Sequence, residues 1–355
     1  MRESKESEGG EVGGETPLRE AWYYALPGHR LRRGKMLAKT ILGEPLLLGR
    51  DAGGGVFALR DLCPHRGIPL SCGRFDGAEI ECCYHGWRFG TDGRCTAIPS
   101  LVPGQAFEVS RIRAAAYPAR EVQGNIWVYG GADPAGAPDI PRIPDIGEAT
   151  GYRLVETMRF PGGIDHAVIG LMDPAHGPFV HRSWWWRSRR SIHEKAKAFA
   201  PSDWGFTMLR HAPSANSRAY RILGGAPETE IAFRLPGIRI EHIRAGRHML
   251  CSLTAVTPID AGSTEVNHAV YWTMPWLTPL RPLLRPFVRS FLRQDRDIVA
   301  KQQAGLRHAP PLLLVNDADT QAKWYYRLKA EYARARAEGR PFVNPVKGRT
   351  LRWRS

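Results

Sequence analysis

The sequence predicts an α+β protein of two domains, in which an all-β domain is followed by a domain of antiparallel strands and helices. The chain has 355 residues, more than a single hydrophobic core usually supports, so two domains are expected. Residues 22–129 consist of short apolar runs separated by turns, whereas strand-like runs precede helical patterns in the part after residue 140. Such segregation of strands and helices is typical of α+β domains.

The composition along the chain predicts where these domains begin and end. Residues 1–18 are rich in Glu, Gly and Ser and have no apolar run, so they are expected to be a disordered acidic tail, not a signal peptide. Residues 19–140 form the β-rich domain, which ends in a linker with four prolines between residues 132 and 144. Residues 141–355 form the second domain.

Within the first domain, a hairpin and a closing strand are expected. The apolar runs at residues 46–48 and 56–59 flank the turn sequence Asp51-Ala-Gly-Gly-Gly, a typical hairpin signal. The run Asn125-Ile-Trp-Val-Tyr129 is the last strand-like segment before the linker.

The second domain is expected to contain consecutive antiparallel strands and then two helices. The strands are predicted at residues 238–240, 249–258 and 264–274, with Asp260-Ala-Gly-Ser as the turn between the last two. The helical patterns cover residues 283–306 and 317–338. Asn316 is the expected N-cap of the last helix and Gly339 its expected end. Asp165-His166 is expected to be a buried structural pair.

Two short loops in the first domain each supply one cysteine and one histidine. They are Cys63-Pro-His65-Arg-Gly and Cys82-Cys-Tyr-His85-Gly, and sixteen residues separate His65 from Cys82. Two thiolates and two imidazoles in this order suit a [2Fe–2S] cluster in which His₂ replaces Cys₂ on one iron. A zinc ribbon also uses paired Cys/His loops, and it is the alternative interpretation.

The two loops resemble the cluster-binding loops of a Rieske domain. High-potential Rieske proteins have a second cysteine in each loop, and these form a disulfide across the cluster. Here Ile68 and Tyr84 occupy those positions, while Cys72 and Cys83 lie at other offsets. The resemblance therefore implies one of the lower-potential members, which pass electrons to oxygen chemistry.

A second motif, Asp173-Pro-Ala-His176-Gly-Pro-Phe-Val-His181, opens the second domain. On a helix Asp173 and His176 would share one face, whereas His181 would lie roughly 140° from His176. Gly177-Pro178 is expected to break the helix and to bring His181 back toward the same point. Two imidazoles and a carboxylate form the facial triad of non-haem Fe(II) oxygenases. Taken alone, the motif is also compatible with ordinary surface or core histidines.

From Trp22 to its end, the chain resembles the terminal oxygenase component of the Rieske non-haem iron oxygenases. The resemblance implies a helix-grip-like catalytic domain in which His176, His181 and a later Asp bind the iron. By its place in the helical segment that follows residue 290, Asp295 is the expected third ligand and Asp297 the alternative. The family pattern gives Asp173 another role: it hydrogen-bonds an iron-binding histidine and, across a subunit boundary, the cluster ligand His85.

The resemblance also implies an activity and partners. Electrons pass from NAD(P)H through a separate reductase, directly or through a ferredoxin, to the [2Fe–2S] cluster and then to a mononuclear Fe(II). With O₂ as co-substrate, the enzyme hydroxylates or oxidatively demethylates a small organic substrate that is aromatic or bulky and lipophilic. The active unit is a homo-oligomer, a trimer. Candidate pocket residues, from the sequence alone, are Phe179, Val180, His268 and Trp272.

Three alternatives to this activity differ in class. Many ring dioxygenases have an Asn where this chain has Ile169, which favours the monooxygenase, demethylase and desaturase branches over a cis-dihydroxylating dioxygenase. A Rieske electron-transfer protein without catalysis would not need the second domain. The net charge of +15 is compatible with nucleic-acid binding, but the arginines are spread along the chain outside any nucleic-acid motif, so no nucleic-acid partner is expected.

Location is predicted from the cysteines and the hydropathy. Six scattered cysteines form no disulfide framework, and thiolate ligands favour a reducing compartment, so a cytoplasmic protein is expected. No run of 18 apolar residues occurs. An arginine stripe at i, i+4 spacing is expected to be a solvated face in preference to a peripheral membrane contact, because Pro282 and Pro286 argue against a long regular helix. Its members are Arg281, Arg285, Arg289 and Arg293.

Overall fold

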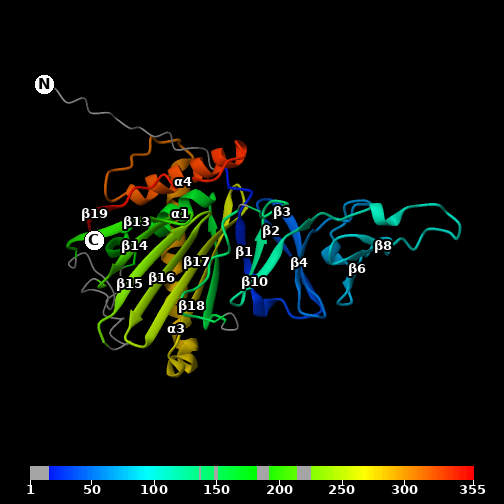
Figure 1. The fold of residues 1–355 in the computed structure, drawn as a ribbon, viewed down its shortest axis with the longest axis horizontal. Helices are drawn as coiled ribbons and strands as arrows, with labels where there is room; N and C mark the ends of the chain where they lie inside the picture. The colour runs from blue at the N-terminus through cyan, green and yellow to red at the C-terminus, as the bar shows by residue number, and fades with distance from the viewer. Residues whose placement is uncertain (1–15, 136, 148–150, 182–191, 214–224) are drawn as a thin grey trace.

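The fold is described by a computed structural model that covers residues 16–135, 137–147, 151–181, 192–213 and 225–355. Figure 1 shows an elongated molecule, with the N-terminal strands in blue and cyan toward one end of the long axis. A large sheet with its helices forms the other end. An all-β part is therefore followed by a sheet with helices, and the predicted α+β class is confirmed.

The N-terminal part contains three small antiparallel sheets. Their strand orders are β1-β11-β10, β2-β3-β4-β9 and β5-β6-β7-β8. The strands are β1 (Trp22–Pro27), β2 (Lys35–Ile41), β3 (Glu44–Arg50), β4 (Val56–Arg60), β5 (Arg74–Phe75), β6 (Glu79–Glu81), β7 (Arg88–Gly90), β8 (Cys95–Ala97), β9 (Ala116–Tyr117), β10 (Ala119–Val122) and β11 (Asn125–Tyr129). Short 3₁₀ helices lie at Gly28–Arg30, Leu70–Cys72 and Val109–Arg111. Strands β3 and β4 pair antiparallel, which confirms the predicted hairpin.

The second part is one antiparallel sheet of eight strands in the order β12-β18-β17-β16-β15-β14-β13-β19. The strands are β12 (Leu154–Pro161), β13 (Glu194–Ser202), β14 (Gly205–His211), β15 (Glu228–Arg234), β16 (Ile238–Ala245), β17 (His248–Asp260), β18 (Ser263–Trp272) and β19 (Arg349–Arg354). The helices are α1 (Ile164–Met172), α2 (Gly177–Val180), α3 (Arg281–Leu306) and α4 (Thr320–Ala337), and a 3₁₀ helix at Pro275–Leu280 precedes α3. The three predicted consecutive strands are β16, β17 and β18, and they pair antiparallel as expected.

Helix α4 was predicted correctly at one end only. It is preceded by Asp319, not Asn316, so the predicted N-cap is wrong. At the C-terminal end Gly339 has φ +64° and donates its N–H to Arg336 O, while Arg340 N–H reaches back to Ala335 O at 3.0 Å. This is the Schellman arrangement that a glycine after a helix favours, because glycine adopts positive φ without strain.

Helix α3 is 26 residues long, so the expectation that its prolines prevent a long helix is wrong. Pro282 lies in the first turn, where a backbone N–H has no partner within the helix and none is lost. Pro286 removes one hydrogen bond close to the exposed start of the helix. The four arginines of the stripe are exposed, as predicted, and Arg285 forms an ion pair with Glu156 of β12.

A buried ion pair joins α1 to α4. Asp165 is 1% exposed, and Lys329 Nζ lies 2.7 and 2.8 Å from its two carboxylate oxygens. The Tyr325 hydroxyl also donates to Asp165 Oδ1, at 2.7 Å. The predicted burial of Asp165 and His166 is confirmed, and Asp165 has its partners on α4. Helix α1 leads directly into the Asp173-x-x-His176 motif, so this pair holds that motif against the rest of the domain.

The two parts are joined by backbone and side-chain hydrogen bonds. Leu42 and Gly43 in the β2–β3 turn donate their N–H groups to Pro258 O and Ile259 O of β17. Asn125 Nδ2 donates to the Tyr271 hydroxyl at 2.6 Å. The predicted domain boundary lies in a segment that packs onto the same interface, because Ile143 is buried and exchanges hydrogen bonds with the Gln123 side chain.

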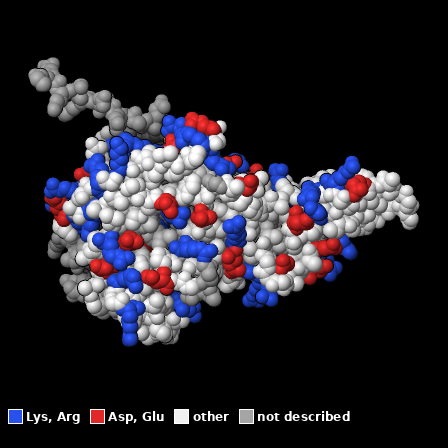
Figure 2. All heavy atoms as spheres, viewed as in Figure 1, with Lys and Arg blue, Asp and Glu red and all other residues white. Residues whose placement is uncertain are grey.

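The predicted acidic tail falls mainly on residues 1–15, which lie outside the described residues. Leu18 is buried in the core, and its carbonyl accepts a hydrogen bond from the Tyr23 hydroxyl, so the prediction of disorder is wrong for this residue. Figure 2 shows Lys and Arg side chains spread over one face and interleaved with Asp and Glu. Within the described part of the chain, no helix has both the length and the apolar character that crossing a membrane requires.

Candidate metal centres

The two Cys/His loops have the same backbone hydrogen bonds. In the first, Cys63 N–H donates to Ile68 O at 2.7 Å and Gly67 N–H to Cys63 O at 2.9 Å. In the second, Cys82 N–H donates to Trp87 O at 2.9 Å and Gly86 N–H to Cys82 O at 3.0 Å. The first loop follows β4, and the second joins β6 to β7. The two loops are therefore copies of one local structure.

The glycines in these loops are required by the backbone. Gly67 has φ +72° and Gly86 has φ +67°, values that residues with a Cβ rarely adopt. Gly67 lies two residues after His65, and Gly86 lies one residue after His85. The positive φ of each glycine turns the chain back toward the cysteine of its own loop. The sequence pattern Cys-x-His-x-Gly and Cys-x-x-His-Gly is thus the signature of this turn.

The loops bring the two thiols and the two imidazoles together. Cys63 and Cys82 are each 3% exposed, and the ring centroids of His65 and His85 are 4.6 Å apart. The Trp87 ring stacks on His65 at 4.5 Å with an interplanar angle of 2°. Cys83 and Cys72 are exposed, so of the adjacent cysteines Cys82 and Cys83, the structure buries Cys82 with Cys63.

The chemistry of this donor set fits an iron–sulfur cluster. Burial and the neighbouring Cys82 thiol raise the pKa of Cys63 to about 11, so without a cation the Cys63 thiol is uncharged. Burial together with the charges of His85 and Arg66 lowers the pKa of His65, which keeps its imidazole neutral. Buried thiols need a metal in order to ionise, and neutral imidazoles are ligands.

The second motif wraps around a single helical turn. Helix α1 ends at Met172, Asp173 follows it, and α2 begins at Gly177 with Pro178 in its first turn. The expected return of His181 toward His176 is confirmed, but Gly177-Pro178 starts a helix where a break was predicted. His176 precedes this turn and His181 follows it, and His181 N–H donates to Gly177 O at 3.0 Å.

Helix α3 supplies the third side chain of this centre. His176 Nε2 and His181 Nε2 are 3.0 Å apart, and Asp295 Oδ1 lies 3.7 Å from the first and 3.2 Å from the second. One donor atom from each residue falls within 4.8 Å of the others. Asp295 is 9% exposed. Asp297 lies on another face of the helix, is exposed and pairs with Arg296 at 2.6 Å.

Asp173 lies beside this group. Its Oδ2 is 3.6 Å from His176 Nδ1, and its Oδ1 accepts a hydrogen bond from Ala175 N–H at 2.7 Å. Burial lowers the pKa of His176, but the carboxylates of Asp173 and Asp295 outweigh burial and the pKa is raised. Such a concentration of negative charge around two imidazoles attracts a cation.

The sequence did not reveal two neighbours of His181. Gln294 Oε1 lies 3.1 Å from His181 Nδ1, and Phe291 stacks on the imidazole with centroids 3.6 Å apart. An amide oxygen accepts only from a protonated Nδ1, so this contact leaves Nε2 as the free donor atom. The signal was the position of Gln294 next to Asp295 on the helix. Two imidazoles and a carboxylate whose Nε2 and Oδ1 atoms converge are the donor set that would hold a mononuclear Fe(II).

A large cavity of about 970 Å³ adjoins this centre. His176, His181 and Asp295 line it, as do alternate residues of the eight-stranded sheet. Of the predicted pocket residues, His268 and Trp272 line the cavity, whereas Phe179 and Val180 do not, and Phe179 is exposed. Burial lowers the pKa of His268 to about 4, and Thr254 Oγ1 lies 2.8 Å from its Nδ1, so this side chain is neutral.

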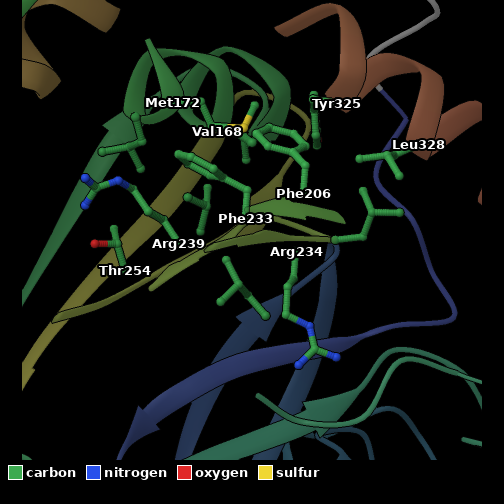
Figure 3. A pocket seen from close by; sticks show the side chains of 14 residues that line it. Val168, Met172, Phe206, Phe233, Arg234, Arg239, Thr254, Tyr325 and Leu328 are labelled. Carbon is green, nitrogen blue, oxygen red and sulfur yellow. The ribbon is translucent and has the colours of Figure 1, made fainter. Parts of the chain in front are cut away.

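A much smaller cavity of about 20 Å³ lies between α1, α4 and the sheet (Figure 3). Val168 and Met172 reach it from α1, and Tyr325 and Leu328 from α4. Met172, Phe233, Arg239 and Thr254 line both cavities, so the small one is an extension under α1.

The two candidate centres lie in different parts of the chain. Figure 1 shows β6, which precedes the second Cys/His loop, and β8 of the same sheet at the end of the long axis opposite the large sheet with α1 and α3. None of the Cys and His residues of the loops lines the cavity.

The chain is similar to known families over most of its length. Residues 21–117 match the Rieske [2Fe-2S] domain, and residues 170–335 match the vanillate O-demethylase oxygenase C-terminal domain. Over 175 residues the chain is 38% identical to the 3-chlorobenzoate-3,4-dioxygenase oxygenase subunit of Comamonas testosteroni, covering 48% of this chain and 40% of the relative. Over 173 residues it is 35% identical to the chloroplastic chlorophyllide a oxygenase of Chlamydomonas reinhardtii. This match covers 48% of this chain and 25% of that relative.

The match therefore spans less than half the length of these relatives. The crystal structure of dicamba monooxygenase bound to dicamba superposes with a TM-score of 0.70 at 23% identity, over 90% of this chain and 98% of that one, which shows the same fold. The chain therefore contains a Rieske [2Fe-2S] domain followed by a domain of the vanillate O-demethylase oxygenase C-terminal family.

Proposed function

We propose that this chain is the terminal oxygenase of a multicomponent Rieske system that hydroxylates or oxidatively demethylates an aromatic or bulky lipophilic substrate. The observation that carries the proposal is the convergence of His176, His181 and Asp295 on the wall of the large cavity. An electron carrier needs the Cys/His loops alone, whereas an oxygenase needs a second metal next to a substrate cavity.

Seven residues hold the two cofactors in this proposal. Cys63, His65, Cys82 and His85 bind the [2Fe–2S] cluster, and His176, His181 and Asp295 bind mononuclear Fe(II). When bound, the two groups supply one-electron transfer and activation of O₂.

The protein's own contribution is positioning. Gln294 holds the tautomer of His181, and Phe291 covers its ring on one side. Asp173 orients His176 through its carboxylate. A substrate in the cavity would have its reacting carbon beside His176, His181 and Asp295, which line the wall.

The cavity favours a substrate larger than a simple benzoate. Its volume of about 970 Å³ is near the upper end of the range for small-molecule sites, roughly 300–1,000 Å³. Apolar side chains from the sheet and α3 form much of the wall, among them Ile231, Leu250, Val270 and Leu284. The relative that acts on chlorophyllide a agrees with a bulky substrate, and Ile169 favours the demethylase and monooxygenase branches over ring dihydroxylation.

Iron content and oxygen uptake test the function. The oxygenase is expected to contain about three irons per chain, two in the cluster and one at the second centre. Reduced protein should consume O₂ faster when a substrate is added, and the product mass should show an added oxygen or a lost methyl group. About two irons per chain, with no uptake above background across a panel of aromatic, sterol and tetrapyrrole compounds, would show an electron carrier instead.

We propose that the active unit is a closed trimer, in which the cluster of one subunit serves the iron of the next. The support is the separation of the two centres along the long axis described above. Exposed apolar side chains lie at both ends: Tyr84 is 53% exposed in the second Cys/His loop, Val102 and Phe107 are exposed beyond β8, and Phe179 is exposed next to the iron motif. Head-to-tail contacts between two such patches generate rings.

Mixed oligomers test this arrangement. A His85→Ala chain lacks a complete cluster site and a His176→Ala chain lacks a complete iron site, so each homo-oligomer should be inactive. When the two are co-expressed, some boundaries pair an intact cluster with an intact iron, and partial activity should return. Mass photometry should show three subunits. If mixed oligomers form and remain inactive, electron transfer takes place within one chain and the trimer proposal is wrong.

The electron donor in this proposal is a separate reductase, with or without a ferredoxin, that takes its electrons from NAD(P)H. The net charge of +15 suits an acidic donor protein, because opposite charges accelerate encounter at low ionic strength. We place the enzyme in the cytoplasm, where thiolate ligands persist in a reducing medium.

A further inference from the structure

One end of the large cavity is polar, and the proposed oxygenase reaction gives these polar groups no role. Lys197 on β13, Thr229 on β15 and Gln321 at the start of α4 line this end. On β13 exposure alternates: Lys195, Lys197 and Phe199 are half-buried or buried, whereas Glu194, Ala196 and Ala198 are exposed. The two lysines are therefore directed into the protein by the pleat of the strand.

Two of these side chains lack a hydrogen-bond partner among the residues that the structure describes. Gln321 is 1% exposed, and neither its Nε2 nor its Oε1 has a partner in the structure. Thr229 is 3% exposed, and its hydroxyl has none either. Buried polar groups are almost always hydrogen-bonded, so two such residues on one cavity wall indicate a polar ligand group between them.

Lys197 adds a positive charge without a matching carboxylate. Its Nζ donates to the Ala212 carbonyl at 3.2 Å, and no acidic side chain of the described residues forms an ion pair with it. Burial lowers the pKa of Lys197, and an anion at this end would reverse that shift. Lys195 lies beside it with its Nζ 2.8 Å from Ser355 Oγ.

The acidic residues of the cavity wall are engaged elsewhere. Asp173 and Asp295 lie at the iron centre, and Glu241 pairs with Arg239 at 2.9 Å. Among the described residues, no acidic side chain of the wall is therefore paired with Lys197.

The sheet register brings the three polar residues to one place. Lys197 contacts Ala212, the residue after His211, and His211 pairs with Thr229 across β14 and β15. Gln321 lies one helical turn before Trp324, whose ring contacts Phe199 of β13 at a centroid distance of 5.7 Å. All three residues therefore surround the β13–β14 edge of the cavity.

This edge is distant from the strands near α3. Helix α3, which carries Asp295, packs along β12, and β18 lies next to β12. From β18 to β13 there are five strand-to-strand steps of about 4.8 Å each. Between the two ends the intervening strands contribute apolar residues, including Ile231, Ile243 and Leu250, together with the polar side chains of Arg239, Glu241, Ser252 and Thr254, and β18 contributes His268.

We propose that Lys197, Gln321 and Thr229 bind the carboxylate of an elongated apolar substrate, whose far end then lies at the iron. The inference rests on the proposed oxygenase function and names its substrate class: an amphipathic carboxylic acid with a rigid apolar body of steroid size. The ammonium of Lys197, the amide of Gln321 and the hydroxyl of Thr229 donate hydrogen bonds to the two carboxylate oxygens. The carboxylate end is held while an unactivated carbon is presented for oxidation.

A matched pair of ligands tests this proposal by binding alone. Lithocholic acid and its methyl ester have the same apolar body and differ in the negative charge. At pH 7.5, calorimetry on the purified oxygenase should show the acid binding about tenfold more tightly than the ester, as expected for a charge-assisted hydrogen bond. Lys197→Gln should remove this preference and leave the affinity for the ester unchanged.

The control variant is Lys301→Gln, which removes an exposed lysine of α3 outside the cavity wall and should retain the preference for the acid. If Lys197→Gln fails to fold, Gln321→Leu gives the same comparison. Equal binding of acid and ester, binding of neither, or an acid preference that survives both cavity substitutions would overturn the proposal. Because binding needs no turnover, these outcomes are separate from a missing third iron or absent oxygen uptake, which would overturn the oxygenase function.

Discussion

Asp295→Ala is expected to remove the mononuclear iron, leave the cluster intact and abolish turnover. Asp295 Oδ1 lies within 3.7 Å of both imidazole Nε2 atoms and is the only carboxylate oxygen that joins them in the described metal group. With its loss, two neutral histidines remain, which hold Fe(II) weakly. Iron analysis should fall from about three to about two atoms per chain. The visible spectrum of the cluster should not change.

Asp297→Ala is the matched control. It removes a carboxylate two residues away on the same helix, and that carboxylate is exposed and paired with Arg296. Iron content, cluster spectrum and turnover should all match the unmodified protein. Loss of the third iron in Asp297→Ala, with retention in Asp295→Ala, would transfer the ligand role to Asp297.

Lys329→Met is expected to cause the largest loss of stability, about 3 kcal/mol in the free energy of unfolding. Asp165 is 1% exposed, and removal of the ammonium leaves its carboxylate with the Tyr325 hydroxyl as its remaining partner among the contacts described. A buried charge without a counter-ion is far more costly than a neutral group of the same shape. Urea unfolding followed by circular dichroism measures the difference.

The double variant Asp165→Asn with Lys329→Met is the control for this effect. An asparagine still accepts the Tyr325 hydroxyl and carries no charge, so most of the lost stability should return. If the double variant is no more stable than Lys329→Met, lost packing of the lysine chain and not an uncompensated charge explains the effect.

The Cys/His loops were predictable because their structure is local. Each loop is closed by two backbone hydrogen bonds within six residues, and the glycines that allow the closure stand at fixed positions in the sequence. The same holds for Gly339, whose positive φ ends α4 through contacts with residues only three to five positions away. Asn316 failed as the N-cap because several residues before α4 have similar capping propensity, and the start of the helix is set by its packing.

The residues of the second centre and the convergence of its two histidines were predictable, but the local structure that brings them together was not. The spacing of Asp173, His176 and His181 identified the motif, whereas the single turn of α2 that brings the histidines together was not foreseen. Gln294 and the cluster of Lys197, Thr229 and Gln321 were missed. They come together only through the docking of α3 and α4 on the sheet and through strand register, and no local pattern encodes those contacts.

Helix α3 links the binding of iron to the binding of substrate, two equilibria that are usually measured separately. It carries Gln294 and Asp295 at one side of the iron centre, and its Leu284, Val288 and Leu292 form part of the cavity wall. Any ligand that displaces this rigid helix changes the geometry of the metal donors at the same time. By thermodynamic reciprocity, the factor by which a substrate alters iron affinity equals the factor by which iron alters substrate affinity. A substrate that fits the cavity against α3 therefore also determines how firmly the enzyme retains its metal.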